Sequence, residues 1–147
     1  SAIRNLIKAV DYSKYNLIIK LHPLDETKVD IDNDSIIVDK SFSTSEMLCV
    51  SNYVISDYSC VIYEAAVKNI PIHFYNYDYD EYDLKRGLAI DYYKELPGVI
   101  SSNPKAIIDG IEYSEKEMKD LVKFSNKYVK PVKNATGDIV DFIYKII

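Results

Sequence analysis

One continuous stretch, residues 52–75, has the pattern of a strand, a turn, a helix and a second strand. Residues 53–55 form a short run of β-favouring side chains, and residues 56–59 (Ser-Asp-Tyr-Ser) interrupt it with types that favour turns and helix caps. Apolar residues recur at helical spacing over 61–66, and Asn69-Ile70-Pro71 ends the helix before a second apolar run. This unit favours an α/β fold.

The turn is the candidate site for an anionic ligand. Backbone N–H groups at a helix start carry partial positive charge, and Ser56, Asp57, Ser59 and Cys60 would surround them. Glu64 lies one helical turn further, where a carboxylate could reach a ribose whose phosphates sit on the turn. The same arrangement is found in nucleotide-sugar transferases with two Rossmann-type domains. The alternative is that these residues only cap a helix, as in many α/β proteins.

The rest of the chain predicts further elements in α/β order. The expected order is helix, strand, strand, helix, strand, helix, strand and then helices, which predicts a Rossmann-like parallel sheet with helices on both faces. Residues 76–83, acidic and rich in tyrosine, are expected to form a loop. The expected helices are 2–10, 45–50 (capped by Thr44 or Ser43), 105–113 (capped by Asn103), 115–128 (with a capping box from Ser114) and 139–147, and the expected further strands are 15–21 and 35–38.

The two histidines have different predicted surroundings. His22 ends an expected strand and precedes Pro23, which restricts His22 to extended or turn conformations. Ligands of open parallel sheets bind at that strand edge, so His22 is a candidate donor to a phosphate oxygen. His73 lies within the apolar run of residues 72–75, where a core position is favoured.

Length and charge limit the number of domains and the kinds of partner that are expected. A chain of 147 residues fits one domain with a sizeable core. The net charge of −5 argues against a nucleic-acid partner. The lysines at positions 123, 127, 130 and 133 are better explained as a solvated helix face. The chain begins on a helix rather than a strand, so we expect it to be a C-terminal fragment of a longer protein.

Metal and membrane signals are weak. Cys49 and Cys60 show no metal-type spacing, which favours neither a zinc site nor a disulfide framework and fits a reducing compartment. No Gly-rich loop with Lys-Ser/Thr and no carboxylate pair for a metal occurs, so no P-loop, metal or cofactor is expected. No run approaches the roughly 18 apolar residues of a membrane span.

Several motifs together resemble a known family. They are Lys20-Leu-His-Pro23, Ile55-Ser-Asp-Tyr-Ser-Cys-Val61, Pro71-Ile-His-Phe-Tyr75 with Asp78 and Tyr82, and Arg86-Gly87 followed by Asp91 and Pro97-Gly98. In this order and spacing they resemble the C-terminal domain of the CDP-glycerol glycerophosphotransferases, the teichoic acid primases and polymerases. The resemblance spans roughly residues 17–101. It implies the C-terminal half of a GT-B-type fold of two Rossmann-type domains, with the nucleotide-diphosphate site in this half.

The resemblance also assigns roles to individual residues. His22 and Ser59 would contact the donor diphosphate, and Asp57 would orient the turn. Cys60 departs from the family's second serine, so only its backbone N–H could serve. Arg86 and Gly87 match the family's Arg-Gly, which would shape the loop over the site. An ion pair between Arg86 and a neighbouring aspartate, Asp83 or Asp91, is the alternative.

The implied reaction moves glycerol phosphate, or a related polyol phosphate, from a CDP-alcohol to an acceptor hydroxyl and releases CMP. The acceptor would be a polyol-phosphate polymer or a lipid-linked molecule. The general base would lie in an N-terminal domain of the same protein, so the fragment alone is expected to be inactive. Kinship would place the longer protein in the cytoplasm, peripheral at the inner face of the cell membrane.

Two other functions fit parts of the sequence. A GT-B glycosyltransferase using a nucleotide sugar would also suit Glu64 and Pro71, and its preference for UDP over CDP would reveal it. A non-catalytic α/β interaction module, similar to a response regulator, would bind no nucleotide, and Asp57 would then be only a cap.

Overall fold

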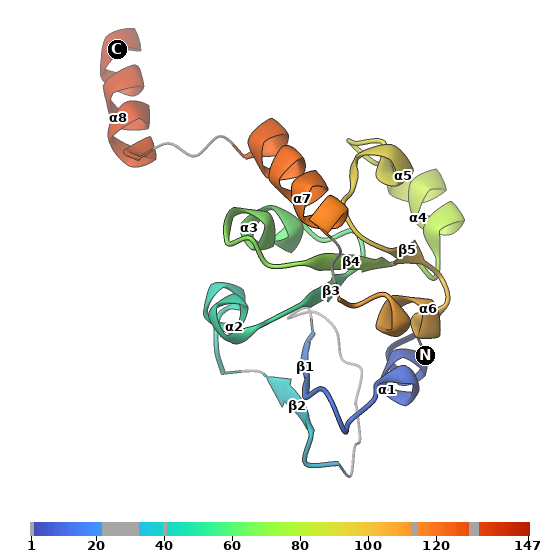
Figure 1. Ribbon diagram of the computed structural model, residues 1–147. Coiled ribbons are helices and arrows are strands. Elements are labelled where there is room, and N and C mark those ends of the chain that lie inside the picture. Colours follow the sequence, from blue (N-terminus) through green and yellow to red (C-terminus); the bar gives the residue numbers. More distant parts are fainter. Residues whose placement is uncertain (1, 22–32, 40, 113–114, 130–132) are drawn as a thin grey trace.

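The computed structural model describes residues 2–21, 33–39, 41–112, 115–129 and 133–147 (Figure 1). Its helices are α1 (Ala2–Ala9), α2 (Thr44–Val50), α3 (Val61–Val67), α4 (Tyr79–Arg86), α5 (Tyr92–Glu95), α6 (Pro104–Asp109), α7 (Glu115–Tyr128) and α8 (Ala135–Ile146), and its strands are β1 (Leu17–Lys20), β2 (Ile36–Asp39), β3 (Val54–Ser56), β4 (Ile72–Tyr75) and β5 (Ile100–Ser101).

The five strands found among the described residues all pair in parallel, as the sequence predicts. They form a two-stranded sheet, β1-β2, and a three-stranded sheet in the order β3-β4-β5. In the larger sheet Ser56 pairs with Phe74, and Phe74 pairs with Ile100. Because the strands are parallel, the carboxyl ends of β3, β4 and β5 lie at one edge of that sheet. This edge carries the predicted site.

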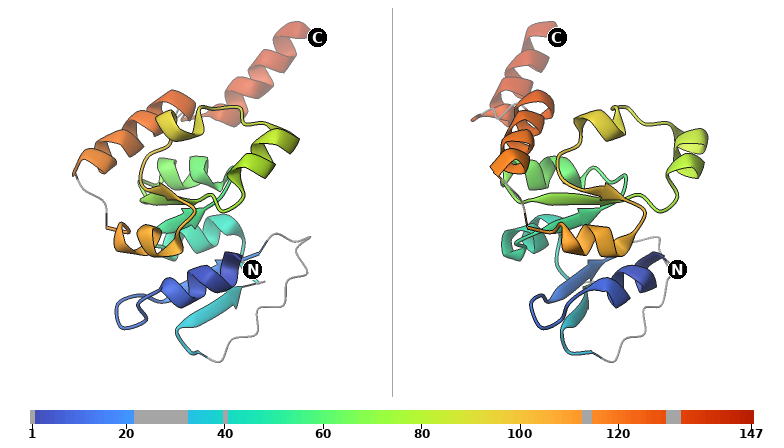
Figure 2. Two further views of the ribbon diagram at one scale, coloured as in Figure 1. Left: turned by 90° about the vertical axis from the view of Figure 1, so that its right-hand side faces the viewer. Right: turned by 45° about the vertical axis from the view of Figure 1, so that its right-hand side comes forward.

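The core is built around β4, whose four residues are all buried. Helix α3 packs on β3 and β4, and α6 packs on β4 and β5. Figures 1 and 2 show α3 and α7 over one face of the larger sheet and α6 over the other. The small side chains of Ala65 and Ala66 are fully buried, which lets the backbone of α3 approach the sheet closely. The prediction of an α/β sheet with helices on both faces is confirmed.

Three elements of the described structure were not predicted from the sequence: helices α4 and α5 and strand β5. The acidic stretch expected to be a loop contains helix α4, with Asp80 and Glu81 in its first turn and Lys85 and Arg86 in its last. These charges complement the helix dipole, and Glu81 and Lys85 form an ion pair across one turn at 2.5 Å. Strand β5 was not predicted, because two residues are too few to produce an alternating pattern.

The helix ends mostly agree with the predicted caps. Ser43 caps α2 in a capping box with Glu46, and Asn103 caps α6 by accepting from the backbone N–H of Lys105. Ser114, the predicted cap of α7, lies outside the described residues. Helix α8 begins at Ala135, four residues earlier than predicted.

Helix α8 projects away from the sheets in Figures 1 and 2 and has no buried residue. Several of its large apolar side chains are exposed, among them Phe142 and Ile143. Within the described ranges no helix combines the length and apolar character that crossing a membrane requires.

His73 is a core residue, as the sequence favours. Its side chain is fully buried, with Nε2 2.8 Å from the carbonyl oxygen of Ile111. The backbone N–H of Val99 donates to Nδ1 at 3.3 Å, so the proton resides on Nε2 and the ring is neutral. Burial lowers the pKa of His73 below its usual value.

We expect His73 to make folding sensitive to mild acid. With a lowered pKa in the folded state, the unfolded state binds more protons below about pH 6.5, so stability falls as pH drops through that value. The slope from one such group is at most about 1.4 kcal/mol per pH unit. Urea unfolding of the wild type and of His73→Gln at pH 7.5, 6.5 and 5.5 measures it.

The control for this experiment is His22→Gln, which removes the other histidine. The variant at position 73 should lose stability at pH 7.5 but show a flatter pH dependence. Equal slopes for the wild type and His73→Gln would contradict the assignment.

Candidate functional site

The predicted turn follows β3 directly. Ser56 ends the strand, Asp57, Ser59 and Cys60 are exposed, and α3 begins at Val61. The Ser59 hydroxyl accepts from the backbone N–H of Val61 at 3.4 Å, near the limit for a hydrogen bond. Cys60 occupies the N-cap position, but its side chain makes no capping hydrogen bond. The turn therefore presents hydroxyls and a thiol at the carboxyl edge of the sheet, with only weak local capping.

Tyrosines from distant parts of the chain hold this turn in place. The Tyr58 ring stacks on Tyr82 of α4, with centroids 3.9 Å apart, and its hydroxyl donates to Asp78 at 3.0 Å. The Tyr92 hydroxyl donates to the backbone carbonyl of Asp57 at 3.1 Å. Burial, aided for Tyr58 by the Asp78 carboxylate, raises the pKa of both phenols well above their usual value. Both hydroxyls therefore stay protonated and donate at physiological pH.

Arg86 and Gly87 lie at the end of α4. Arg86 follows Tyr82 by four residues, so it shares the helix face that carries the ring stacked on Tyr58. Asp91, one expected partner of Arg86, pairs with Lys94 at 2.7 Å instead. Within the described part of the chain Arg86 has no ion pair with Asp83 either, so the guanidinium is available for an anion. Gly87 has φ 69° and ψ 161°, a backbone conformation nearly restricted to glycine.

Glu64 is exposed on α3, and its carboxylate accepts from the Ser45 hydroxyl of α2 at 2.8 Å. This bond ties the start of α2 to α3 across the molecule's surface. One carboxylate oxygen of Glu64 is therefore already engaged by the protein. Its role toward a ribose stays a prediction.

His22 lies outside the described residues, two positions after β1. The end of that strand is fixed by Lys20, which donates to Asp39 at 2.8 Å and also to the backbone carbonyl of Phe42. The hydrogen bond from Lys20 and the backbone N–H of Ser41 hold the pKa of Asp39 below its usual value. Sequence analysis missed this pair, which joins the carboxyl ends of β1 and β2.

The basic residues near the C-terminus do not form an anion site in the described structure. Lys123 pairs with Asp120 at 2.9 Å, and Lys127 pairs with Glu95. Both side chains are exposed, in agreement with the solvated helix face favoured by the sequence. Among the described residues no group of His, Cys, Asp and Glu could hold a metal ion.

Fold and site together define a class of protein: a Rossmann-like α/β domain with a candidate anion-binding turn at the carboxyl edge of its sheet. A sequence model of the family described as CDP-Glycerol:Poly(glycerophosphate) glycerophosphotransferase matches residues 3–145, and the chain belongs to that family. The resemblance noted in the sequence is thereby confirmed.

Curated relatives and solved structures agree with this assignment. The teichoic acid glycerol-phosphate primase of Staphylococcus aureus (strain NCTC 8325 / PS 47) is 38% identical over 134 residues, which cover 90% of this chain and 34% of that protein. The teichoic acid glycerol-phosphate transferase of the same strain is 34% identical over 87% of this chain and 31% of its own length. The structure of the wall teichoic acid polymerase TagF superposes with a TM-score of 0.77 and 25% identity, covering 97% of this chain and 37% of that one. The chain thus spans about a third of the length of these relatives.

We expect the Tyr58–Asp78 hydrogen bond to stabilise the turn measurably. Tyr58→Phe keeps the ring stack but leaves the carboxylate without its donor, which should lower the free energy of unfolding by about 1 kcal/mol. A double-mutant cycle with Asp78→Ala, read by urea unfolding, should give a coupling energy of about 0.5–1.5 kcal/mol.

Tyr63→Phe is the matched control. Tyr63 packs on Phe124, and within the described ranges its hydroxyl makes no hydrogen bond, so its loss should leave stability within about 0.5 kcal/mol. A coupling energy of zero between positions 58 and 78 would contradict a stabilising role of this bond.

Proposed function

We propose that this chain is the donor-binding part of a transferase that moves glycerol phosphate from CDP-glycerol to an acceptor hydroxyl and releases CMP. The observation that carries the proposal is the family match over residues 3–145, together with the Ser-Asp-Tyr-Ser turn at the carboxyl edge of the sheet. A variant of TagF soaked with CDPG superposes on this chain with a TM-score of 0.77, which supports a CDP-alcohol as the donor.

In this proposal the turn and α4 hold the diphosphate. The hydroxyls of Ser56 and Ser59 and the backbone N–H of Cys60 donate to phosphate oxygens, and the Arg86 guanidinium neutralises part of their charge. We assign to His22, two positions after β1 in the sequence, a further hydrogen bond to the diphosphate. Asp57 orients the turn and Glu64 binds the ribose.

The reaction that follows is a phosphoryl transfer. The acceptor oxygen attacks the β-phosphorus, the bond from that phosphorus to the bridging oxygen breaks, and CMP leaves with the bonding electrons. This chemistry depends mainly on positioning and on stabilising charge in the transition state, which hydroxyls, N–H groups and a guanidinium supply. The base that takes the acceptor's proton belongs to an N-terminal domain, so this chain alone binds the donor without turning it over.

The acceptor and the location follow from the same kinship. The relatives are named as teichoic acid transferases, primases and polymerases, which supports a polyol-phosphate polymer or a lipid-linked acceptor. We place the longer protein at the inner face of the cell membrane, where such an acceptor would be presented.

Calorimetry with this chain tests the proposal. CDP-glycerol and CMP should bind more tightly than UDP-glucose and UDP. Ser59→Ala and His22→Ala should each weaken CDP-glycerol about tenfold, the loss expected for one hydrogen bond to a charged group. Arg86→Gln should weaken it at least as much, because it removes a positive charge.

Thr136→Ala, which removes an exposed hydroxyl from α8, is the control and should bind CDP-glycerol like the wild type. A preference for uridine nucleotides would point to a glycosyltransferase instead. If a folded chain binds none of the four ligands, either alone or within the longer natural protein, the proposal is wrong and the turn only caps a helix.

A further inference from the structure

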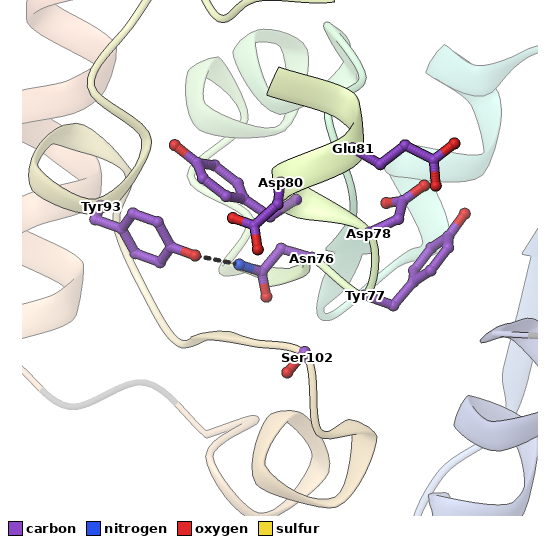
Figure 3. A pocket seen from close by; sticks show the side chains of 8 residues that line it. Asn76, Tyr77, Asp78, Asp80, Glu81, Tyr93 and Ser102 are labelled. Atoms are coloured by element: carbon purple, nitrogen blue, oxygen red, sulfur yellow. Dashed lines mark hydrogen bonds between the residues drawn. The ribbon is translucent and has the colours of Figure 1, made fainter. Parts of the chain in front are cut away.

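A pocket of 390 Å³ lies beside the turn, at the same edge of the sheet (Figure 3). Its floor includes Asn76, the first residue after β4, and Ser102, the first residue after β5. The remaining lining comes from Tyr93 and from residues 77–81, which include the first turn of α4. Asp78 belongs to this lining and accepts the Tyr58 hydrogen bond, so the pocket and the turn share a wall.

The Asn76 side chain is incompletely satisfied. Only 6% of the residue is exposed, and its Nδ2 donates to the Tyr93 hydroxyl at 2.8 Å. Its Oδ1 is buried and has no hydrogen-bond partner among the described residues. Figure 3 shows this oxygen directed toward the side of the pocket where Ser102 lies. A buried acceptor without a donor is destabilising, and a ligand that supplies the donor would remove that destabilisation.

The charges of the pocket select among ligands. Asp78, Asp80 and Glu81 all line it, while Glu81 is paired with Lys85. Within the described ranges no ion pair or hydrogen bond engages the Asp80 carboxylate. The pocket is therefore electronegative and repels phosphate, whereas a neutral group with O–H donors satisfies both the amide oxygen and the carboxylate.

The aromatic lining points to the same chemistry. Tyr77 and Tyr93 line the pocket and are 50% and 57% exposed. Such rings offer an apolar face to C–H groups and a hydroxyl for hydrogen bonding, so they suit a ligand that is apolar along its carbons and polar at each oxygen. A polyol has this character.

We propose that this pocket binds the uncharged polyol end of the substrate, through Asn76, Asp80 and Tyr93. The inference rests on the proposed function and adds a second subsite to it: the turn takes the diphosphate and the pocket takes the glycerol or a similar polyol. The polyol has two sources in such a reaction, the alcohol of the donor and the terminal unit of the acceptor.

Two substitutions test the proposal. Asp80→Asn removes the charge of an exposed residue, and Tyr93→Phe removes the hydroxyl and keeps the ring. Asp109→Asn on α6 and Tyr144→Phe on α8 are matched controls for the same chemical changes outside the pocket. Calorimetry measures the affinities of each variant for CDP-glycerol and for CDP, and steady-state kinetics on the longer natural protein measures the KM for an oligo(glycerol phosphate) acceptor.

The two sources of the polyol give different results. If the donor's alcohol occupies the pocket, both pocket variants bind CDP-glycerol about 3- to 10-fold more weakly and bind CDP unchanged. If the acceptor's terminal unit occupies it, donor affinity is unchanged and the acceptor KM rises about 3- to 10-fold. Unchanged affinity and KM in both variants, or equal weakening of CDP and CDP-glycerol, would overturn the proposal.

A spectroscopic experiment separates this inference from the proposed function. In ¹⁵N-labelled wild-type protein, glycerol should shift the side-chain amide resonances of Asn76, and inorganic phosphate should not. If CDP-glycerol fails to bind but glycerol still produces the shift, the donor role fails and the polyol site stands. No shift with glycerol, in a chain that binds CDP-glycerol with the affinity of CDP, would show that the pocket takes no polyol.

Discussion

The candidate site depends on the side chain of Tyr58. Its ring stacks on Tyr82 of α4, and its hydroxyl bonds to Asp78, twenty residues away in the sequence. Helix α3 has only seven residues, and its N-cap residue Cys60 makes no side-chain capping hydrogen bond, so the local chain does little to fix the turn before it. The position of the serine hydroxyls at the sheet edge is therefore set by packing between segments that are distant in sequence.

The parts of the fold that short-range patterns determine could be predicted from the sequence. Strand β4 consists of one aliphatic, two aromatic and one histidine residue, bounded by a proline and an asparagine, and the turn before α3 is made of residues that favour turns. The family resemblance came from the same local motifs. His73 could also be assigned to the core, because a lone histidine within an apolar run is more often buried than functional.

The other features of the fold and of the candidate site depend on contacts between residues that are distant in the sequence, so they could not be predicted from it. The Tyr92 hydroxyl donates to the backbone carbonyl of Asp57, thirty-five positions away in the sequence, and no sequence pattern predicts that hydrogen bond. Helix α4 was missed because tyrosine and aspartate have modest helix propensity, although the acids at its start and the bases at its end were a usable signal. The sequence also did not identify Asn76 as a candidate site residue. A polar residue directly after a buried parallel strand marks the ligand edge, but only the structure shows its oxygen without a partner.

The distribution of charge explains why two subsites would lie so close together. A CDP-alcohol is anionic at its diphosphate and neutral at its polyol, and the edge of the sheet has the complementary division. Arg86 and the N–H and hydroxyl groups of the turn suit the anion, while Asp80 and Asn76 suit hydroxyls. The hydrogen bond from Tyr58 to Asp78 lies on the boundary between them. Because this hydrogen bond joins the turn to the lining of the pocket, it would hold the two proposed subsites at a fixed spacing, which a substrate spanning both requires.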